Sequence, residues 1–294
     1  MSFSHNAKDE LCKIPVASDC CAVAESLGIL LYCNTFSQRE VRVVTESPAL
    51  AKRLPRLFQR AFGVTFDSAQ VGSAKTTFLI TERAKLETIF GACGFAGSNM
   101  IAHHINLGVL EEDCCRRSFA RGAFLAGGAV TDPAKSYHLE LVTDHFSVSR
   151  ELLSLLGEMG FSPKEASRGG HYIAYFKQSA AIEDFLTTLG APVSAMTLMA
   201  AKVEKDLRNS VQRRVNCDTG NVSKLVDAAQ SHIDAIERLG AELDKLPQKL
   251  RDTAMLRVDN PESSLAELAE LHSPPITKSC LNHRLRKLVE LAQR

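Results

Sequence analysis

The chain has 294 residues, long enough for two or three domains that each bury their own core. Hydrophobic residues make up 45% of it and charged residues 23%, the ordinary balance of a soluble globular protein, and no apolar run reaches the ~18 residues of a membrane span. The net charge of +1 provides no overall attraction to nucleic acid, so any DNA-binding surface must be a local patch.

The N-terminus and the cysteines indicate the compartment. Residues 1–13 lack a basic segment followed by an apolar core, so we expect no secretory signal. The nine cysteines are odd in number and mostly lie in apolar helical patterns, which is typical of a reducing environment. No Cys-x-x-Cys pair occurs, and His103 and His104 lack partners at zinc-site spacing. We therefore expect a cytoplasmic protein with buried thiols, no metal and no small-molecule cofactor.

An internal repeat organises the first two thirds of the chain. Asp19-Cys20-Cys21 begins one predicted helix, and Asp113-Cys114-Cys115 begins another 94 residues later, with Gly28 and Gly122 in the same register. Each helix opens with an acidic residue suited to its N-cap and then carries an apolar face. Because glycine costs a helix about 1 kcal/mol relative to alanine, the two glycines indicate a close approach of two helix backbones.

Similar strands and helices are predicted after each leading helix. The first is followed by strands at 40–45, 64–71 and 76–81, with helices at 48–62 and from Arg83. The second is followed by strands at 137–143, 161–166 and 171–176, with helices at 149–159 and 180–189. The pattern predicts a pseudo-symmetric α+β domain with a first repeat at 1–92, a connector at 93–112 and a second repeat at 113–191.

The leading helices resemble degenerate copies of the LAGLIDADG motif of homing endonucleases, in which paired glycines pack two helices and an acid before the second glycine binds metal. Gly122 and Gly128 keep the six-residue glycine spacing, whereas Gly28 is followed by Asn34. The acid positions hold Cys33 and Gly127, and neither supplies the oxygen ligands that hard divalent cations require. The resemblance implies a saddle of tandem αβ repeats in which catalysis is lost.

Two other classes of protein stay open at this point. An active metal-dependent endonuclease would need Asp132, with Asp19 or Asp113, as metal ligands, but the register that makes Asp132 the motif acid breaks the 94-residue repeat. A protein-interaction scaffold that has lost DNA affinity is the third possibility. A magnesium-dependent cleavage assay and a DNA band shift at low salt separate these classes.

A helical linker is predicted at 192–245. It comprises a connector at 192–214, a polar turn or helix start at 216–221 and a periodic helix at 223–239. Arg208, Arg213 and Arg214 precede the polar segment, where they either contact DNA phosphates or complement a solvated helix end.

Residues 246–294 predict an all-helical domain. Helices are expected at 246–258, after a Ser263 or Ser264 cap with Glu267 in capping-box position, and from Thr277 to near Ala292. Two short helices joined by a turn match the helix-turn-helix plan, although two prolines lengthen the turn.

The last helix has an apolar face formed by leucines at 281, 285, 288 and 291, with basic and polar residues elsewhere. Asn and Arg can form bidentate bonds with base edges, and Lys and Ser can bind phosphates, so the helix either recognises DNA or merely closes a helical bundle. The candidate DNA-binding residues are Thr277, Lys278, Ser279, Asn282, His283, Arg284, Arg286 and Lys287.

Two further basic stretches lie in the repeats. They are candidate accessory DNA contacts, although long basic side chains also lie on solvated faces without binding anything. The residues are Lys52, Arg53, Arg56 and Arg60 in one stretch, and Arg116 and Arg117, with Arg121 nearby, in the other.

Over essentially its whole length the chain resembles the WhiA family of transcriptional regulators. The resemblance is carried by the opening at 1–4, the 121–128 helix, the 213–224 stretch and the helix-turn-helix from Ser263. It implies an inactive nuclease-like domain, which serves as an accessory surface, and a helix-turn-helix similar to the promoter-binding part of sigma factors. It further implies roles in sporulation, cell division and chromosome segregation, location at the nucleoid, and promoter DNA and RNA polymerase or a sigma factor as partners.

Overall fold

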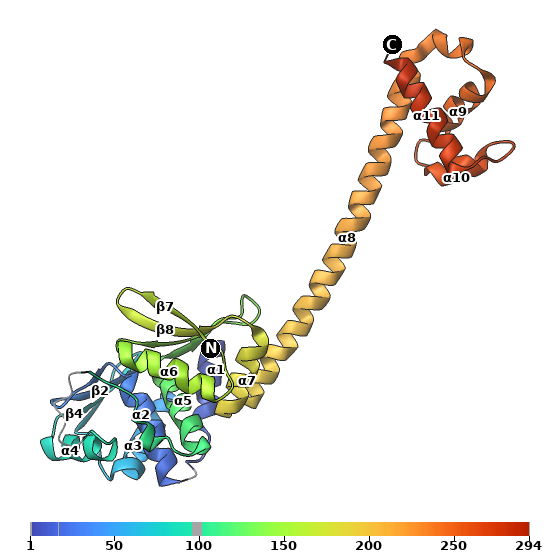
Figure 1. Ribbon diagram of the computed structural model, residues 1–294. Helices are drawn as coiled ribbons and strands as arrows, with labels where there is room; N and C mark the ends of the chain where they lie inside the picture. The colour runs from blue at the N-terminus through green and yellow to red at the C-terminus, as the bar shows by residue number, and fades with distance from the viewer. Residues whose placement is uncertain (1, 17, 96–101, 294) are drawn as a thin grey trace. The chain divides into compact units, whose positions relative to one another are not determined.

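The computed structural model describes residues 2–16, 18–95 and 102–293, and the chain forms two compact units, Met1–Asp206 and Leu207–Arg294 (Figure 1). The connector predicted at 93–112 includes residues 96–101, which lie outside the described residues. Among the described residues, no helix is both long enough and apolar enough to cross a membrane.

The first unit contains two copies of one α/β arrangement. The first copy comprises α2 (Asp19–Leu31), β1 (Thr35–Phe36), β2 (Val41–Thr45), α3 (Pro48–Phe62), β3 (Ser68–Val71), β4 (Thr76–Ile80) and α4 (Arg83–Ala92). The second comprises α5 (Asp113–Gly127), β5 (Gly128–Val130), β6 (Leu139–Thr143), α6 (Phe146–Glu158), β7 (Lys164–Arg168), β8 (His171–Phe176) and α7 (Ser179–Leu189). Both sheets are antiparallel, with the matching orders β1-β2-β4-β3 and β5-β6-β8-β7. The predicted pseudo-symmetric α+β fold is confirmed.

Helices α2 and α5 pack against each other at the centre of this unit (Figure 1). A Cβ atom added to Gly28 would lie 2.2 Å from the Phe119 carbonyl oxygen, and one added to Gly122 would lie 2.0 Å from that of Glu25. No side chain fits at either position, because carbon and oxygen atoms cannot approach so closely. The predicted close approach of the two backbones is therefore confirmed.

The helix starts differ from the prediction in one respect. Ser18 is the N-cap of α2 and accepts a hydrogen bond from the Cys21 amide, whereas Asp19 is the first helical residue. Likewise Glu112 is the N-cap of α5, and Asp113 follows it. The two aspartates therefore act through the helix dipole in the first turn and not as caps.

Some short elements were not predicted from the sequence. They are α1 (Phe3–Cys12), the two-residue β1, the three-residue β5 and the 3-10 turn η1 (Leu107–Val109). The last three are segments of two or three residues, which have no recognisable period. Helix α1 is capped by the Ser2 side chain, which accepts a hydrogen bond from the His5 amide at 3.2 Å.

Helix α8 (Pro192–Leu239) belongs partly to each unit and is continuous, so the polar turn predicted at 216–221 is wrong. Polar side chains there bond to one another one helical turn apart: the Gln212 amide donates to the Asn216 Oδ1 at 2.8 Å, and the Asn221 amide to the Cys217 Sγ at 3.7 Å. Such i, i+4 pairs stabilise the helix where residue propensities alone favour a turn.

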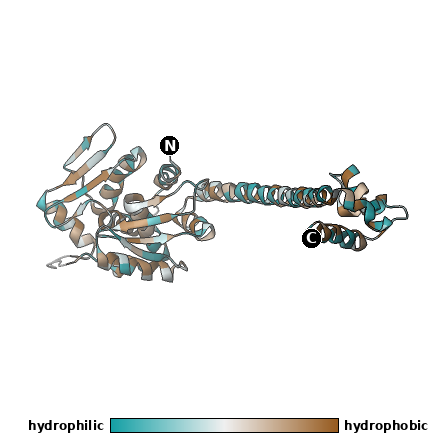
Figure 2. Cartoon of the chain, turned by 90° about the horizontal axis from the view of Figure 1, so that it is seen from above, coloured by the Kyte–Doolittle hydropathy of each residue, from teal (hydrophilic) through white to brown (hydrophobic). Residues whose placement is uncertain are grey.

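The second unit adds η2 (Gly240–Lys245), α9 (Gln248–Asp259), α10 (Leu265–Leu271) and α11 (Lys278–Ala292). Ser264 and Glu267 form the predicted capping box at the start of α10, which is confirmed. Figure 2 shows apolar and polar residues along α11, whose C-terminal end is marked there. Its apolar residues pack into a small core formed by Ile236, Leu239, Ala254, Leu268, Ala269, Leu281, Leu285 and Leu288.

Candidate nucleic-acid interface

Helix α11 has one buried face and one exposed face. Leu281, Leu285 and Leu288 are at most 1% exposed, and Leu291 is partly buried against the same core, so the predicted apolar face is confirmed. Thr277 caps the helix by accepting from the Cys280 amide at 3.2 Å. The exposed members of the candidate set are Thr277, Lys278, Ser279, His283, Arg286 and Lys287. The helix therefore presents these six residues to solvent together.

The other two candidates on α11 are half-buried. Arg284 reaches towards α9, where its Nη1 lies 3.5 Å from the Thr253 Oγ1, and Asn282 is half-exposed. On the exposed face, Lys287 lies 3.4 Å from the Glu290 carboxylate, and such a surface ion pair contributes little. Lys278 and Arg286 form no ion pair with any residue that the structure describes.

The loop between α9 and α10 is organised by a buried arginine. Arg257 is 2% exposed, and its guanidinium donates to the carbonyl oxygens of Asn260, Pro261 and Ser263. These bonds give donors to three carbonyls after the end of α9, of which that of Asn260 also accepts from the Ser263 amide at 3.3 Å. No pattern in the sequence distinguishes Arg257 from a surface arginine.

The three arginines of the linker lie within α8. Arg208, Arg213 and Arg214 are exposed, but no turn follows them. They are positions along one helix, and the interpretation that they complement a helix end is therefore wrong.

The basic stretch on α3 divides into buried and exposed residues. Arg53 is 9% exposed, forms two bonds with the Glu25 carboxylate at 2.6 and 2.9 Å, and donates to the Cys12 and Ile14 carbonyls. These bonds occupy its guanidinium, so its prediction as a DNA contact is wrong. Arg60 is exposed but pairs with Asp19 at 3.0 Å. Lys52 and Arg56 are exposed and have no ion-pair partner in the described part of the chain.

The arginines of the second basic stretch, on α5, also bond mainly to groups within the protein. Arg121 donates to the Leu189 carbonyl at 2.8 Å and lies 3.3 Å from the Glu25 carboxylate, so two arginines share one buried acid. Arg116 donates to the Leu110 carbonyl and pairs with Glu158 at 3.5 Å. Arg117 is exposed and reaches back to the Asp113 carbonyl.

The two motif positions that correspond to metal-binding acids lie at the C-terminal ends of α2 and α5. The Cys33 thiol donates to the Leu30 and Thr35 carbonyls, and burial raises its pKa to about 12, so the thiol stays protonated. A Cβ atom at Gly127 would lie 2.5 Å from the Val142 carbonyl oxygen, which leaves no room for an acid. These residues do not fit a divalent metal ion.

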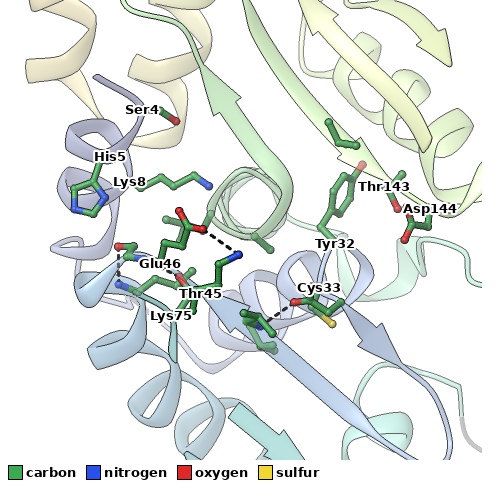
Figure 3. Close-up of a pocket in the computed structure, with 18 of the residues that line it drawn as sticks. Ser4, His5, Lys8, Tyr32, Cys33, Thr45, Glu46, Lys75, Thr143 and Asp144 are labelled. Atoms are coloured by element: carbon green, nitrogen blue, oxygen red, sulfur yellow. Dashed lines mark hydrogen bonds and ion pairs between the residues drawn. The ribbon is translucent and has the colours of Figure 1, made fainter. Parts of the chain in front are cut away.

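Two acidic residues near these helix ends were not predicted from the sequence. Glu46 and Asp144 directly follow β2 and β6 and line a cavity of about 440 Å³, one from each repeat (Figure 3). Glu46 pairs with Lys75 at 3.2 Å, and Asp144 pairs with His171. The missed signal is their separation of 98 residues, which is the offset between β2 and β6, whereas the leading helices are offset by 94. Both carboxylates already have a basic partner.

The acids that an active endonuclease would require do not converge. Asp132 follows β5, where its side chain accepts from the Ala134 amide at 3.0 Å within a turn. Asp19 and Asp113 begin α2 and α5, at the opposite helix ends from Cys33 and Gly127.

The prediction of buried thiols is wrong for part of the set. Cys20, Cys217 and Cys280 are exposed. The spacing rules predicted no metal site, yet Cys20, Cys21, Cys114 and Cys115 lie together at the start of α2 and α5.

Tandem αβ repeats that pack through two glycine-bearing helices, joined in one chain to a helix-turn-helix unit, define a LAGLIDADG-like protein with an added helix-turn-helix domain. Residues 116–208 match the family model of the WhiA LAGLIDADG-like domain, and residues 211–292 match that of the WhiA C-terminal HTH domain.

Similar proteins share nearly the full length. A protein of Ruminiclostridium cellulolyticum named "Probable cell division protein WhiA" is 38% identical over 100% of this chain and 98% of its own, and one of Alkaliphilus metalliredigens with the same name is 35% identical over the same shares. The chain belongs to the WhiA family. The full-length WhiA structure from Thermotoga maritima has the same fold, with a TM-score of 0.61 at 22% identity, covering 100% of this chain and 99% of that one.

Proposed function

We propose that this protein is a sequence-specific transcription regulator that binds double-stranded promoter DNA through α11. The observation that carries the proposal is the exposed face of α11, where Lys278, His283 and Arg286 point away from the leucine core. An arginine can form two bonds with guanine in the major groove, and Thr, Ser and Lys at the start of the helix can bind phosphates. Asn282, half-exposed beside them, can form paired bonds with adenine.

The cellular role follows from the family. The relatives from Ruminiclostridium and Alkaliphilus carry cell division in their name, and this supports a role in cell division for the present chain. Sporulation and chromosome segregation belong to the same proposal, as does action in the cytoplasm at the nucleoid.

The LAGLIDADG-like domain acts without catalysis. Cys33 and Gly127 stand where metal-binding acids would be needed, and the Glu46 and Asp144 carboxylates already contact Lys75 and His171. We expect no cleavage of promoter DNA by the purified chain with magnesium. Cleavage would support the competing assignment as a metal-dependent endonuclease.

The same domain provides a second, weaker DNA surface. Lys13, Lys52, Arg56 and Arg60 line a groove along α3, and three of them lie within three turns of one helix. Lysine and arginine side chains in such a groove can contact phosphates without recognising sequence. Docking of RNA polymerase or a sigma factor on this surface is the alternative, and it predicts that DNA affinity does not depend on these residues.

Binding of the full chain to promoter DNA at two salt concentrations tests the main proposal. The Asn282→Ala/Arg286→Ala variant should lose about 2–6 kcal/mol of binding free energy, since each of the two base contacts contributes about 1–3 kcal/mol. The control is Lys245→Ala/Lys249→Ala, which removes two exposed lysines outside α11 and should bind like the unmodified chain.

An equal loss of binding free energy in both variants would mean that the chain binds DNA through general electrostatic attraction and not through base contacts of α11. No band shift at low salt would instead favour a protein-interaction scaffold without DNA affinity.

A further inference from the structure

Four cysteine thiols meet at the amino-terminal ends of the two central helices. Cys20 and Cys21 lie in the first turn of α2, Cys114 and Cys115 lie in the first turn of α5, and the four Sγ atoms are all within 4.8 Å of one another. The cluster crosses between the repeats, because two of the four thiols come from α2 and two from α5. The internal repeat thus brings two Cys-Cys pairs face to face.

We propose that these four cysteines bind one zinc ion as a tetrahedral tetrathiolate site. Zinc–sulfur bonds of about 2.3 Å in a tetrahedron place the sulfur atoms about 3.8 Å apart. The Sγ atoms of Cys114 and Cys115 are already 4.0 Å apart, and the widest separation in the set is 4.8 Å. Small side-chain rotations therefore close the site around an ion.

The chemistry of the donors selects the metal. Four thiolates are soft ligands that favour zinc or iron, whereas magnesium and calcium require oxygen. A cluster of several irons needs room for bridging sulfides between its thiolates, and sulfur atoms within 4.8 Å of one another leave space for one ion only. Of zinc and iron, zinc is the ion that takes four thiolates in a closed structural site without redox chemistry.

The surroundings stabilise the negative charge of the thiolates. Both pairs lie at helix N-termini, where the partial positive charge of the helix dipole favours thiolates. The Ser18 hydroxyl lies 3.0 Å from the Cys20 Sγ. It can donate to the Cys20 thiolate, as outer partners of metal ligands usually do. The nearby Asp19 carboxylate is paired with Arg60.

The burial of the four residues indicates a structural role. Cys21 is 5% and Cys115 is 2% exposed, while Cys20 is exposed and Cys114 is half-buried, so an ion can enter from the outer side. Four protein ligands leave no open position for a substrate. Further along the same helices, Gly28 and Gly122 hold the backbones in contact, and zinc would join the two repeats at the other end. This site involves neither DNA nor α11, so it stands apart from the proposed function.

Metal analysis of the full chain, purified under reducing conditions and dialysed after zinc addition, tests the site. We expect about one zinc per chain by mass spectrometry, and a thiolate-to-metal charge-transfer band when cobalt replaces zinc. Cys20→Ser/Cys114→Ser removes the two more accessible ligands and should weaken cobalt binding by roughly 100-fold or more. Cys217→Ser/Cys280→Ser removes two exposed cysteines outside the cluster and should bind cobalt normally.

Several outcomes would overturn the assignment. They are a folded, reduced chain that holds less than a tenth of an equivalent of zinc, equal zinc in both variants, iron in place of zinc, or a disulfide within the cluster in freshly purified reduced protein. If Cys20→Ser/Cys114→Ser does not fold, the zinc content and the Tm of the unmodified chain test the proposal. Zinc should raise the Tm of the metal-free protein reversibly, and an unchanged Tm would contradict the proposal.

Discussion

Helices α3 and α11 carry similar basic patterns but use them differently. On α3, Arg53 turns inward to the buried Glu25 and Arg60 pairs with Asp19, whereas Lys278 and Arg286 of α11 point to solvent. The difference arises from what each helix packs against. α3 covers α2, which carries a buried carboxylate, whereas α11 packs on leucines.

The comparison shows that a basic helix indicates DNA binding only when its charges lack partners inside the protein. An arginine in a buried ion pair stabilises the fold, because removing one partner leaves an uncompensated charge. An exposed arginine contributes little to stability and is available to a ligand. Substitutions of basic residues in the two units should therefore separate stability from DNA affinity.

The largest effect should come from Arg53. Arg53→Ala leaves Glu25, which is 1% exposed, with Arg121 as its one ionic partner among the described residues, and we expect the free energy of unfolding of the first unit to fall by about 3–5 kcal/mol. Urea denaturation measures this. Arg56→Ala, one turn away and exposed, is the matched control and should change stability by less than about 0.5 kcal/mol. Similar losses of unfolding free energy in both variants would contradict the distinction between buried and exposed arginines of α3.

Arg257 extends the comparison into the second unit. Arg257→Ala would remove the guanidinium donor from the carbonyls of Pro261 and Ser263 and leave that of Asn260 with the Ser263 amide alone, and we expect the free energy of unfolding to fall by about 2–3 kcal/mol. Arg286→Ala in the same unit should leave the Tm unchanged while weakening DNA binding. Calorimetric melting of both variants checks the pair, and a lower Tm for Arg286→Ala would mean that α11 depends on that side chain for its fold.

A smaller effect on stability, and one that depends on pH, should come from the buried imidazole of His103. Burial, helped by the neighbouring His145, lowers the pKa of His103 from 6.5 to about 4, and their ring centroids lie 4.2 Å apart. The unfolded chain therefore takes up a proton on His103 at a higher pH than the folded chain does. The contribution of the neutral His103 to the free energy of unfolding is fully present above about pH 6.5 and is lost as the pH falls towards 4.

His103→Gln should make the free energy of unfolding less dependent on pH in that window, as measured by urea titrations at several pH values. His283→Gln, on the exposed face of α11, is the control and should keep the full dependence. An unchanged slope for His103→Gln would assign the acid sensitivity to other groups.

Much of the fold could be predicted because the repeat and its periodicity are encoded locally. Helix α3, strand β8 and the Ser264 capping box follow from patterns within a few residues. The glycine contact also followed, since glycine in two helices has few other uses. The continuous helix α8 was missed because propensities at 216–221 favour a turn, while i, i+4 side-chain bonds favour the helix.

The site was harder to predict because it depends on contacts between distant residues. Nothing near Arg53 in the sequence indicates Glu25, which lies 28 residues away. The cysteine cluster was missed for a similar reason: spacing rules search one stretch of chain, whereas the two Cys-Cys pairs meet only through the pairing of α2 with α5. By contrast, the leucines of α11 alone determine its outward face.

The smallest predicted effect tests whether the comparison between α3 and α11 is complete, because Lys52 and Arg56 remain exposed on α3. If they contact phosphates, Lys52→Gln/Arg56→Gln should reduce the slope of log Kd against log salt by up to about 2, since each phosphate contact contributes about 0.9. Lys164→Gln/Lys177→Gln, also exposed but in the second repeat, is the control with the same charge change. A slope that changes in neither variant would leave α11 as the DNA-binding surface, because the α3 groove would then have no electrostatic role on DNA, and its basic side chains would either dock protein or lie on a solvated face.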